Sequence, residues 1–260
     1  MSPPYDKHQA EEQLAEGTLI SHLLELRSRM MKAVMAVVFV FLCLTPFMNP
    51  VFEFVSRPLR DALPEGSAMI VTDVAAPFLT PMKTAFFVAL FIAMPVVLYQ
   101  VWQFVAPGLY KREKRLAIPL LISSILLFYS GIAVAYFIVF KVMFGFFVGV
   151  TPTGVDMTPD ISAYLSFVLG IFLAFGLAFE VPIATVLLIW SGLVSVTALK
   201  KARPYMFLGA FVAGMLLAPD VFSMTLMALP IYALYEGGLL MARVLVPEKM
   251  GAETAPAQKS

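Results

Sequence analysis

Long apolar stretches separated by short clusters of charge dominate the chain. Stretches without any charged residue cover 33–48, 84–110 and 116–140, and two longer apolar stretches cover 161–199 and 204–242. A helix needs about 20 apolar residues to cross the hydrocarbon layer of a bilayer. The pattern therefore predicts an all-α integral membrane protein.

The two longest stretches need separate interpretation. The stretch over 161–199 contains one charge, Glu180, and we count it as a single span that returns to loop near residue 190. The stretch over 204–242 contains Pro219 and Asp220 side by side, which is typical of a turn. Dividing it there leaves a first helix too short for a full bilayer, so we expect the membrane to be thinned locally.

Six transmembrane helices follow, in one polytopic domain over 1–260, at 33–48, 78–104, 116–141, 162–190, 204–218 and 221–242. They are accompanied by a lead-in helix over 1–32, an outer cap loop over 49–77 and a tail over 243–260. Prolines within the spans remove backbone donors and bend helices, which predicts a curved wall: Pro46, Pro95, Pro119, Pro182 and Pro230.

The distribution of basic residues predicts the orientation. The two terminal segments and the loops after the second and fourth spans hold 14 of the 18 Lys and Arg. Because loops rich in Lys and Arg stay in the cytoplasm, these segments, both termini included, are predicted to be cytoplasmic.

Composition then excludes several classes of protein. The net charge of +1 gives no case for nucleic-acid binding, and the lone Cys43 cannot form an internal disulfide or a thiolate metal site. Histidines occur at His8 and His22 alone, and neither a HExxH motif nor a phosphate-binding GxxxxGK[ST] loop is present. We therefore expect no enzyme activity and no cofactor.

Four acids are candidates for chemistry because of where they fall: Glu25, Glu113, Glu180 and Glu236. Glu25 precedes Arg29 by four residues, and such a pair on an exposed helix contributes only ~0.2–0.5 kcal/mol. Glu113 lies among four bases, where a solvated acid is the plain interpretation. Both nevertheless fall in short cytoplasmic elements, where two carboxylates can each bind a guanidinium through two hydrogen bonds.

Glu180 lies in the middle of a span, where an acid is costly and usually faces a cavity, a partner or a proton relay. The alternative is a protonated side chain that bonds a neighbouring Ser, Thr or carbonyl. Glu236 lies nearer the cytoplasmic end and can extend toward water. Aromatic and amide residues gather at the cytoplasmic end of the second span, as an interfacial belt or as a docking floor for an apolar peptide: Tyr99, Gln100, Trp102, Gln103, Phe104 and Tyr110.

Several stretches, in order, resemble the TatC family, the polytopic subunit of the twin-arginine protein translocase. They are SHLLELRSRM before the first span, MIVTDVAAPF in the outer loop, YQVWQFVAPGLYKREKR at the first cytoplasmic loop, AYLSFVLGIFLAFGLAFEVP in the fourth span, KARPY before the fifth span and GMLLAPDVFS at the last hairpin. The resemblance implies a cupped six-helix wall in a bacterial inner membrane, with Glu180 on its concave side.

The resemblance also implies a function and its residues. It implies a receptor for signal peptides of folded precursors, powered by the proton gradient, in which Glu25 and Glu113 recognise two consecutive arginines. The surrounding patch would comprise Arg27, Phe104, Leu109, Tyr110 and Lys111. Pro58 and Phe78 match important outer-loop positions. The implied partners are the single-span proteins TatA and TatB, other copies of the chain and membrane lipid.

One departure from the family pattern concerns the docking of TatA and TatB, expected along the last two spans near Met215, Asp220 and Thr225. The hairpin LLAPDVFSMT is one residue shorter than the family pattern and has Ala218 and Met224 at polar positions. Two other functions stay open on the residues alone. One is a proton-coupled transporter of a small solute that uses Glu180, and the other is a scaffold for single-span proteins.

Overall fold

The structure is a computed structural model, and it describes residues 7–61, 63, 68–105, 114–218 and 220–245. Every regular element within these ranges is a helix, apart from an isolated parallel bridge between Ile70 and Asp160. The predicted all-α architecture is confirmed for this part of the chain.

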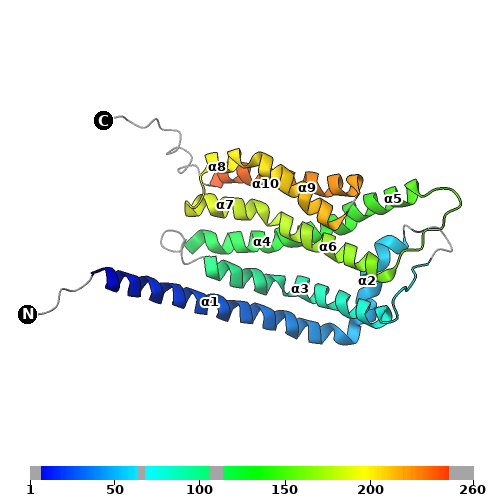
Figure 1. Cartoon of the computed structure of the whole chain (residues 1–260), viewed down its shortest axis with the longest axis horizontal. Helices are drawn as coiled ribbons and strands as arrows, with labels where there is room; N and C mark the ends of the chain where they lie inside the picture. Colours follow the sequence, from blue (N-terminus) through cyan, green and yellow to red (C-terminus); the bar gives the residue numbers. More distant parts are fainter. Residues whose placement is uncertain (1–6, 62, 64–67, 106–113, 219, 246–260) are drawn as a thin grey trace, which may run out of the picture.

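The elements form an elongated bundle (Figure 1). In chain order they are α1 (Lys7–Leu44), the 3-10 turn η1 (Thr45–Phe47), α2 (Met48–Arg60), α3 (Ala76–Val105), α4 (Lys114–Val134), the π-helical turn η3 (Ala135–Val139), α5 (Phe140–Val150), α6 (Ile161–Phe179), α7 (Val181–Ser191), α8 (Val196–Lys201), α9 (Arg203–Leu217) and α10 (Val221–Leu245). The start of α1 and the end of α10 lie at the same end of the bundle (Figure 1).

Five helical stretches of the described chain are long and apolar enough to cross a membrane. They are Ile20–Arg60, Ala76–Phe104, Ile118–Val150, Ile161–Ser191 and Val221–Val244. The helix α9 is apolar but has 15 residues, about 22 Å at the usual rise per residue, which is shorter than the hydrocarbon layer. Six crossings with cytoplasmic termini stay a prediction.

Two helical stretches extend beyond the bounds expected from hydropathy. The helix α1 begins at Lys7, so the lead-in segment and the first span are one continuous helix of 38 residues. The third span continues through η3 and α5 to Val150 instead of ending near 141, because Lys141 is exposed and no proline follows it before Pro152. Hydropathy marks the apolar part of a helix, whereas the helix itself ends where the backbone pattern is broken.

The outer cap contains more helix than the expected loop over 49–77. Its first part is α2, which turns back against α3, and α3 itself begins at Ala76. Val55 and Leu59 of α2 are buried while Glu53 and Arg57 are exposed, so α2 is amphipathic.

The fourth span is divided at Glu180, which ends α6 and precedes α7. Pro182 lies in the first turn of α7, where its missing N–H costs no intrahelical bond. Gly192 ends α7 in the left-handed conformation at φ 76°, a conformation that favours glycine. The return to loop expected near residue 190 therefore has a local cause.

The main core lies where α3, α4 and α6 meet and is rich in phenylalanine. The rings of Phe91 and Phe172 lie edge to face at 6.0 Å, and Phe128 is fully buried between these helices. A Cβ atom placed on Gly131 would lie 2.5 Å from the carbonyl oxygen of Phe175, so α4 and α6 approach too closely for any larger residue there.

A second unit is formed by α10 packed on α7 and α9. Gly238 of α10 faces α7, and a Cβ atom there would lie 2.8 Å from the Cα atom of Pro182. Gly214 of α9 faces α10, where a Cβ atom would lie 2.8 Å from the carbonyl oxygen of Met224. Small residues therefore set the close contacts on both sides of α10.

An apolar hollow of about 500 Å³ opens among α2, α3, α4 with η3, and α6. The rings of Phe54 and Tyr136 stack at its side with centroids 5.5 Å apart. Its lining is Pro50, Val51, Phe54, Val55, Val88, Phe91, Ile92, Tyr129, Ile132, Ala133, Tyr136, Phe137 and Phe172.

Candidate functional site

The acid of the SHLLELRSRM stretch is paired within its own helix. Arg29 donates to Glu25 Oε1 from two nitrogens, from Nε at 3.0 Å and from Nη2 at 2.5 Å. The Glu25 side chain is 36% exposed and the Arg29 side chain 18%, so the base lies deeper than the acid. The helical pair expected from the spacing is present.

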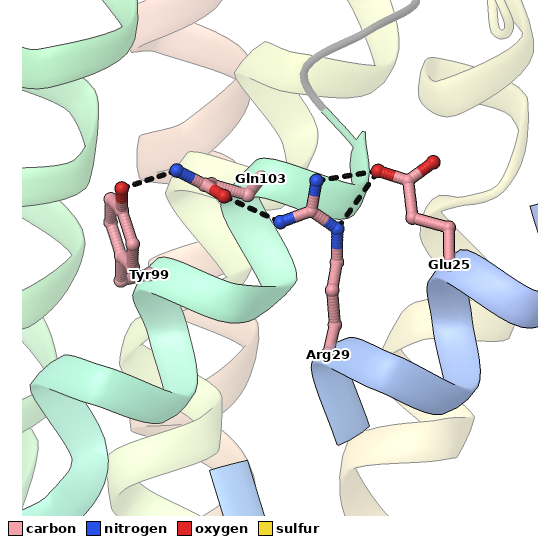
Figure 2. Close-up of polar contacts among 4 residues, drawn as sticks. All are labelled: Glu25, Arg29, Tyr99 and Gln103. Atoms are coloured by element: carbon pink, nitrogen blue, oxygen red, sulfur yellow. Dashed lines mark hydrogen bonds and ion pairs between the residues drawn. The ribbon is translucent and has the colours of Figure 1, made fainter. Parts of the chain in front are cut away.

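The arginine of this pair also contacts another helix (Figure 2). Arg29 Nη1 donates to Gln103 Oε1 of α3 at 2.5 Å, and Gln103 Nε2 donates to the Tyr99 hydroxyl one turn away. A carboxamide accepts through its oxygen alone, so the bond to Tyr99 orients this oxygen toward Arg29. Glu25, Arg29, Gln103 and Tyr99 form one polar chain between α1 and α3, called here the Arg29 link.

A ring contact lies beside the Arg29 link. His22 of α1 stacks on Phe104 of α3 with ring centroids 4.4 Å apart. Sequence reasoning placed Phe104 in the patch but gave no role to His22, and it treated Gln103 as part of a belt or floor. The missed signal is spacing, because His22, Glu25 and Arg29 recur every three or four residues and so share one helical face.

The other predicted patch residues divide into two groups. Arg27 is exposed on α1. The remaining four lie outside the described residues, namely Leu109, Tyr110, Lys111 and Glu113. The structure therefore brings the part of α1 that holds Glu25 beside the end of α3 that holds Phe104, whereas the joint action of Glu25 and Glu113 stays a prediction.

Glu180 lies at the junction of α6 and α7 and faces α4. Its Oε2 atom accepts a hydrogen bond of 2.5 Å from the hydroxyl of Ser124, a residue that is fully buried. Its other oxygen, Oε1, is buried and has no hydrogen-bond partner among the described residues. A serine partner was one of the two possibilities raised by the sequence, and the second oxygen remains available to a further donor.

Glu236 is held inside the unit formed by α9 and α10. It accepts from Arg203 Nη2 at 2.7 Å through Oε2 and from the Tyr232 hydroxyl at 3.0 Å through Oε1. The adjacent Tyr235 hydroxyl donates to the carbonyl of Leu199. Glu236 therefore has a structural partner and does not simply extend to water.

The predicted docking residues lie around the turn between α9 and α10. Met215 is 55% exposed, and Asp220 caps α10 by accepting from the Ser223 backbone N–H at 2.7 Å. The Thr225 hydroxyl donates to the carbonyl of Val221 within the same helix. Of the two positions that depart from the family pattern, Ala218 is fully buried, and the backbone of Met224 packs against Gly214.

At the other end of the bundle, Asp160 ties the segment before α3 to the start of α6. Oδ1 caps α6 by accepting from the Ser162 and Ala163 backbone N–H groups, both at 2.9 Å. Oδ2 accepts from the backbone N–H and the hydroxyl of Thr72 at 3.1 and 2.7 Å. The Ala163 N–H, and after it the Thr72 hydroxyl, lower the pKa of Asp160 below its ordinary value.

Sequence reasoning did not identify Asp160. The outer-loop positions that it did identify are Pro58, which lies inside α2, and Phe78, which is 64% exposed in the first turn of α3. Among the described residues there is no group of three or more His, Cys, Asp or Glu side chains that could hold a metal ion.

Comparison with known proteins places these features in a family. The model of the family described as Sec-independent protein translocase protein (TatC) matches residues 21–230. The TatC protein of Escherichia coli K12 is 55% identical over 229 residues, which are 88% of this chain and 89% of that protein. The TatC protein of Azotobacter chroococcum is 55% identical over 92% of this chain and 95% of its own.

A solved structure has the same fold. The crystal structure of a twin-arginine translocase receptor, TatC, superposes with a TM-score of 0.79 and 38% identity, covering 86% of this chain and 98% of that one.

Proposed function

Since the chain belongs to the TatC family of Sec-independent protein translocase proteins, multi-pass proteins of the bacterial inner membrane that act in transport and are not enzymes, we propose that it binds twin-arginine signal peptides. The Glu25 carboxylate in the middle of α1 and the Glu113 carboxylate bind the two arginines of the peptide. The bound precursor is then moved across the membrane in its folded state at the expense of the proton gradient.

The observation that carries the proposal is the contact between Glu25 and a guanidinium. Arg29 already reaches Oε1 through two nitrogens, so the carboxylate has the position and exposure that an arginine needs. Lysine carries a single ammonium and cannot reproduce a two-nitrogen contact. A site of this kind favours paired arginines over paired lysines.

The remaining steps of the proposal concern the peptide's apolar part and the partner proteins. The apolar part lies along the concave wall beside Glu180, whose buried Oε1 is available to a donor. Proteins of the TatA and TatB kind, each with one span, dock along α9 and α10 near Met215, which is exposed there. Other copies of the chain complete the complex.

The test is photocrosslinking of a twin-arginine peptide to the full chain in lipid nanodiscs. Exchange of Glu113→Gln or Glu25→Gln should reduce the crosslinking yield about tenfold or more, because each removes the charge from a two-nitrogen hydrogen bond. Glu53→Gln is the matched control, since Glu53 is an exposed acid of α2 at the opposite end of the bundle.

A peptide with two lysines in place of the arginines is the second control. A receptor of the proposed kind loses binding and export of the lysine form. Equal binding of both peptides would exclude the receptor function. Unchanged crosslinking yield and unchanged export in both glutamine variants would exclude it as well. A carrier of small solutes would be indifferent to this exchange.

A further inference from the structure

The Arg29 link leads to a specific inference about how the proposed receptor is regulated. We propose that Arg29 is a tethered occupant of the Glu25 site, and that a signal-peptide arginine binds by displacing it. The inference rests on the proposed function, because it concerns the same carboxylate. It adds a competitor that belongs to the chain itself and a second helix that holds this competitor in place.

The chemistry of the contact supports competition. Arg29 uses Nε and Nη2 on Glu25, and both bonds end on Oε1. An incoming guanidinium that binds in bidentate geometry needs both carboxylate oxygens of Glu25, including Oε1. The two arginines therefore cannot both bind Glu25 in their best geometry, and the peptide must exchange with Arg29.

The position of Arg29 indicates a fixed side chain and not a transient surface contact. Its side chain is 18% exposed, half the exposed fraction of Glu25, and its hydrogen bond to Gln103 places the guanidinium between Glu25 and α3. The second oxygen of Glu25 points away from Arg29 (Figure 2), and because the Glu25 side chain is partly exposed, a peptide can approach it from this side.

The third nitrogen explains why the competitor is effective. Nη1 donates to Gln103 Oε1, and Tyr99 orients that amide, so the guanidinium is held in place from α3. A pre-oriented side chain loses less conformational entropy when it binds than a mobile one. Gln103 and Tyr99 are therefore positioning residues that strengthen the hold of Arg29 on Glu25.

After exchange, Arg29 keeps a partner. The Gln103 oxygen can retain Nη1 while Nε and Nη2 turn to water, so displacement does not leave an unpaired buried charge. Recognition thus replaces one guanidinium by another at the same carboxylate. Selectivity follows, because a ligand must compete with an arginine and a lysine does so poorly.

The test is the affinity of the full chain in nanodiscs for a twin-arginine peptide. Arg29→Gln removes the competitor and should lower the Kd about two- to fivefold, the range expected for loss of a part-exposed ion pair. Lys32→Gln is the control for net charge, since Lys32 is an exposed base of the same helix, and it should change the Kd less than twofold.

Two further measurements separate this inference from the proposed function. In a Glu25→Gln background, Arg29→Gln should no longer tighten binding, because the contested carboxylate is gone. Gln103→Leu, which leaves both Glu25 and Arg29 in place, should tighten binding in the same direction by a smaller factor.

The outcomes are distinct. If the wild type prefers arginine to lysine and depends on Glu25, but Arg29→Gln and Gln103→Leu leave the Kd unchanged or raise it, the tethered competitor is excluded and the receptor function stands. If the wild type does not distinguish arginine from lysine, the receptor function itself fails. Should Arg29→Gln not fold, Gln103→Leu alone decides, since an unchanged Kd there excludes the held competitor.

Discussion

The guanidinium of Arg203 at the start of α9 and the carboxylate of Glu236 in α10 form an ion pair at 2.7 Å across the last helical hairpin. Their side chains are 42% and 30% exposed, so solvent screens the pair in part. The pair joins α9 to α10, and it explains by structure why an acid lies within the last span.

Exchange of Glu236→Gln should lower the stability of the hairpin by about 0.5–1 kcal/mol, because one charge of a screened pair is lost. The loss should shrink at high salt. Thermal unfolding in nanodiscs at low and high salt measures this loss of stability. Arg243→Gln, in the last turn of α10, is the control. Export should persist. A variant that unfolds normally yet exports nothing would instead give Glu236 a functional role.

Two adjacent glycines of α10 offer a matched pair of substitutions. Gly238→Ala should destabilise the protein by about 1–3 kcal/mol, because the new Cβ atom would lie 2.8 Å from the Cα atom of Pro182. Gly237→Ala should be neutral or stabilise by up to about 1 kcal/mol, because a Cβ atom there meets nothing within 4 Å. Thermal unfolding of both variants provides the comparison, and equal losses would contradict the close packing of α10 on α7.

The hydrogen bond between Glu180 and Ser124 predicts that substitutions of the two partners lower stability by different amounts. Ser124→Ala should cost about 1–3 kcal/mol, because it leaves both oxygens of a largely buried carboxyl group without a protein donor. Glu180→Gln should cost less, because a carboxamide oxygen still accepts from Ser124. Unfolding measurements on the two single variants and on the double variant test this, and a larger loss in Glu180→Gln would mean that the charge itself stabilises the junction.

The contacts of Asp160 predict that its contribution to stability depends on pH only well below neutrality. Its pKa is lowered in the folded protein, so its stabilising contribution is complete above the ordinary carboxyl value and is lost as pH falls through the lowered one. The protection factor of the Thr72 amide, which corrects hydrogen exchange for its intrinsic dependence on pH, should therefore stay constant from pH 8 to about 5, counting from the ordinary carboxyl value of about 4, and should fall only in stronger acid.

Asp160→Asn separates the two functions of this side chain. The remaining carboxamide oxygen can still cap α6, whereas its NH₂ group cannot accept from Thr72. The Thr72 amide should then have a low protection factor at every pH, while the Ala163 amide remains protected. Asp156→Ala, in the same connecting segment, is the control. Protection of Thr72 in the asparagine variant would show that the segment is held by other contacts.

The sequence predicted the contacts that depend on local spacing. Residues four apart on a helix are neighbours, so the Glu25 and Arg29 pair followed from their positions. The helices followed from composition, because only long apolar helices can satisfy both lipid and backbone. The helix ends at Val150 and Lys7 did not follow, since hydropathy does not report on helix continuation into polar residues.

Contacts between distant segments could not be predicted. Arg29 and Gln103 are 74 positions apart, and Ser124 and Glu180 are 56 apart. Asp160 and Thr72, 88 positions apart, meet only because the loops before α3 and α6 end side by side. Each pair needs the packing of two helices or loops, and a single sequence carries no signal of which polar residues face each other.

Because few side chains of α1 are buried, the Arg29 link also matters for the contact between α1 and α3. Among the α1 side chains that the structure describes, Val37 alone is less than a tenth exposed, at 8%. Lipid chains solvate leucine and phenylalanine as well as protein does, so close packing and hydrogen bonds between the helices hold α1 on α3. The hydrogen bond from Arg29 to Gln103 therefore adds a polar contact to the packing of α1 on α3, which also includes the rings of Phe41 and Phe86, and an arginine that captures Glu25 would also act on the contact between these two helices.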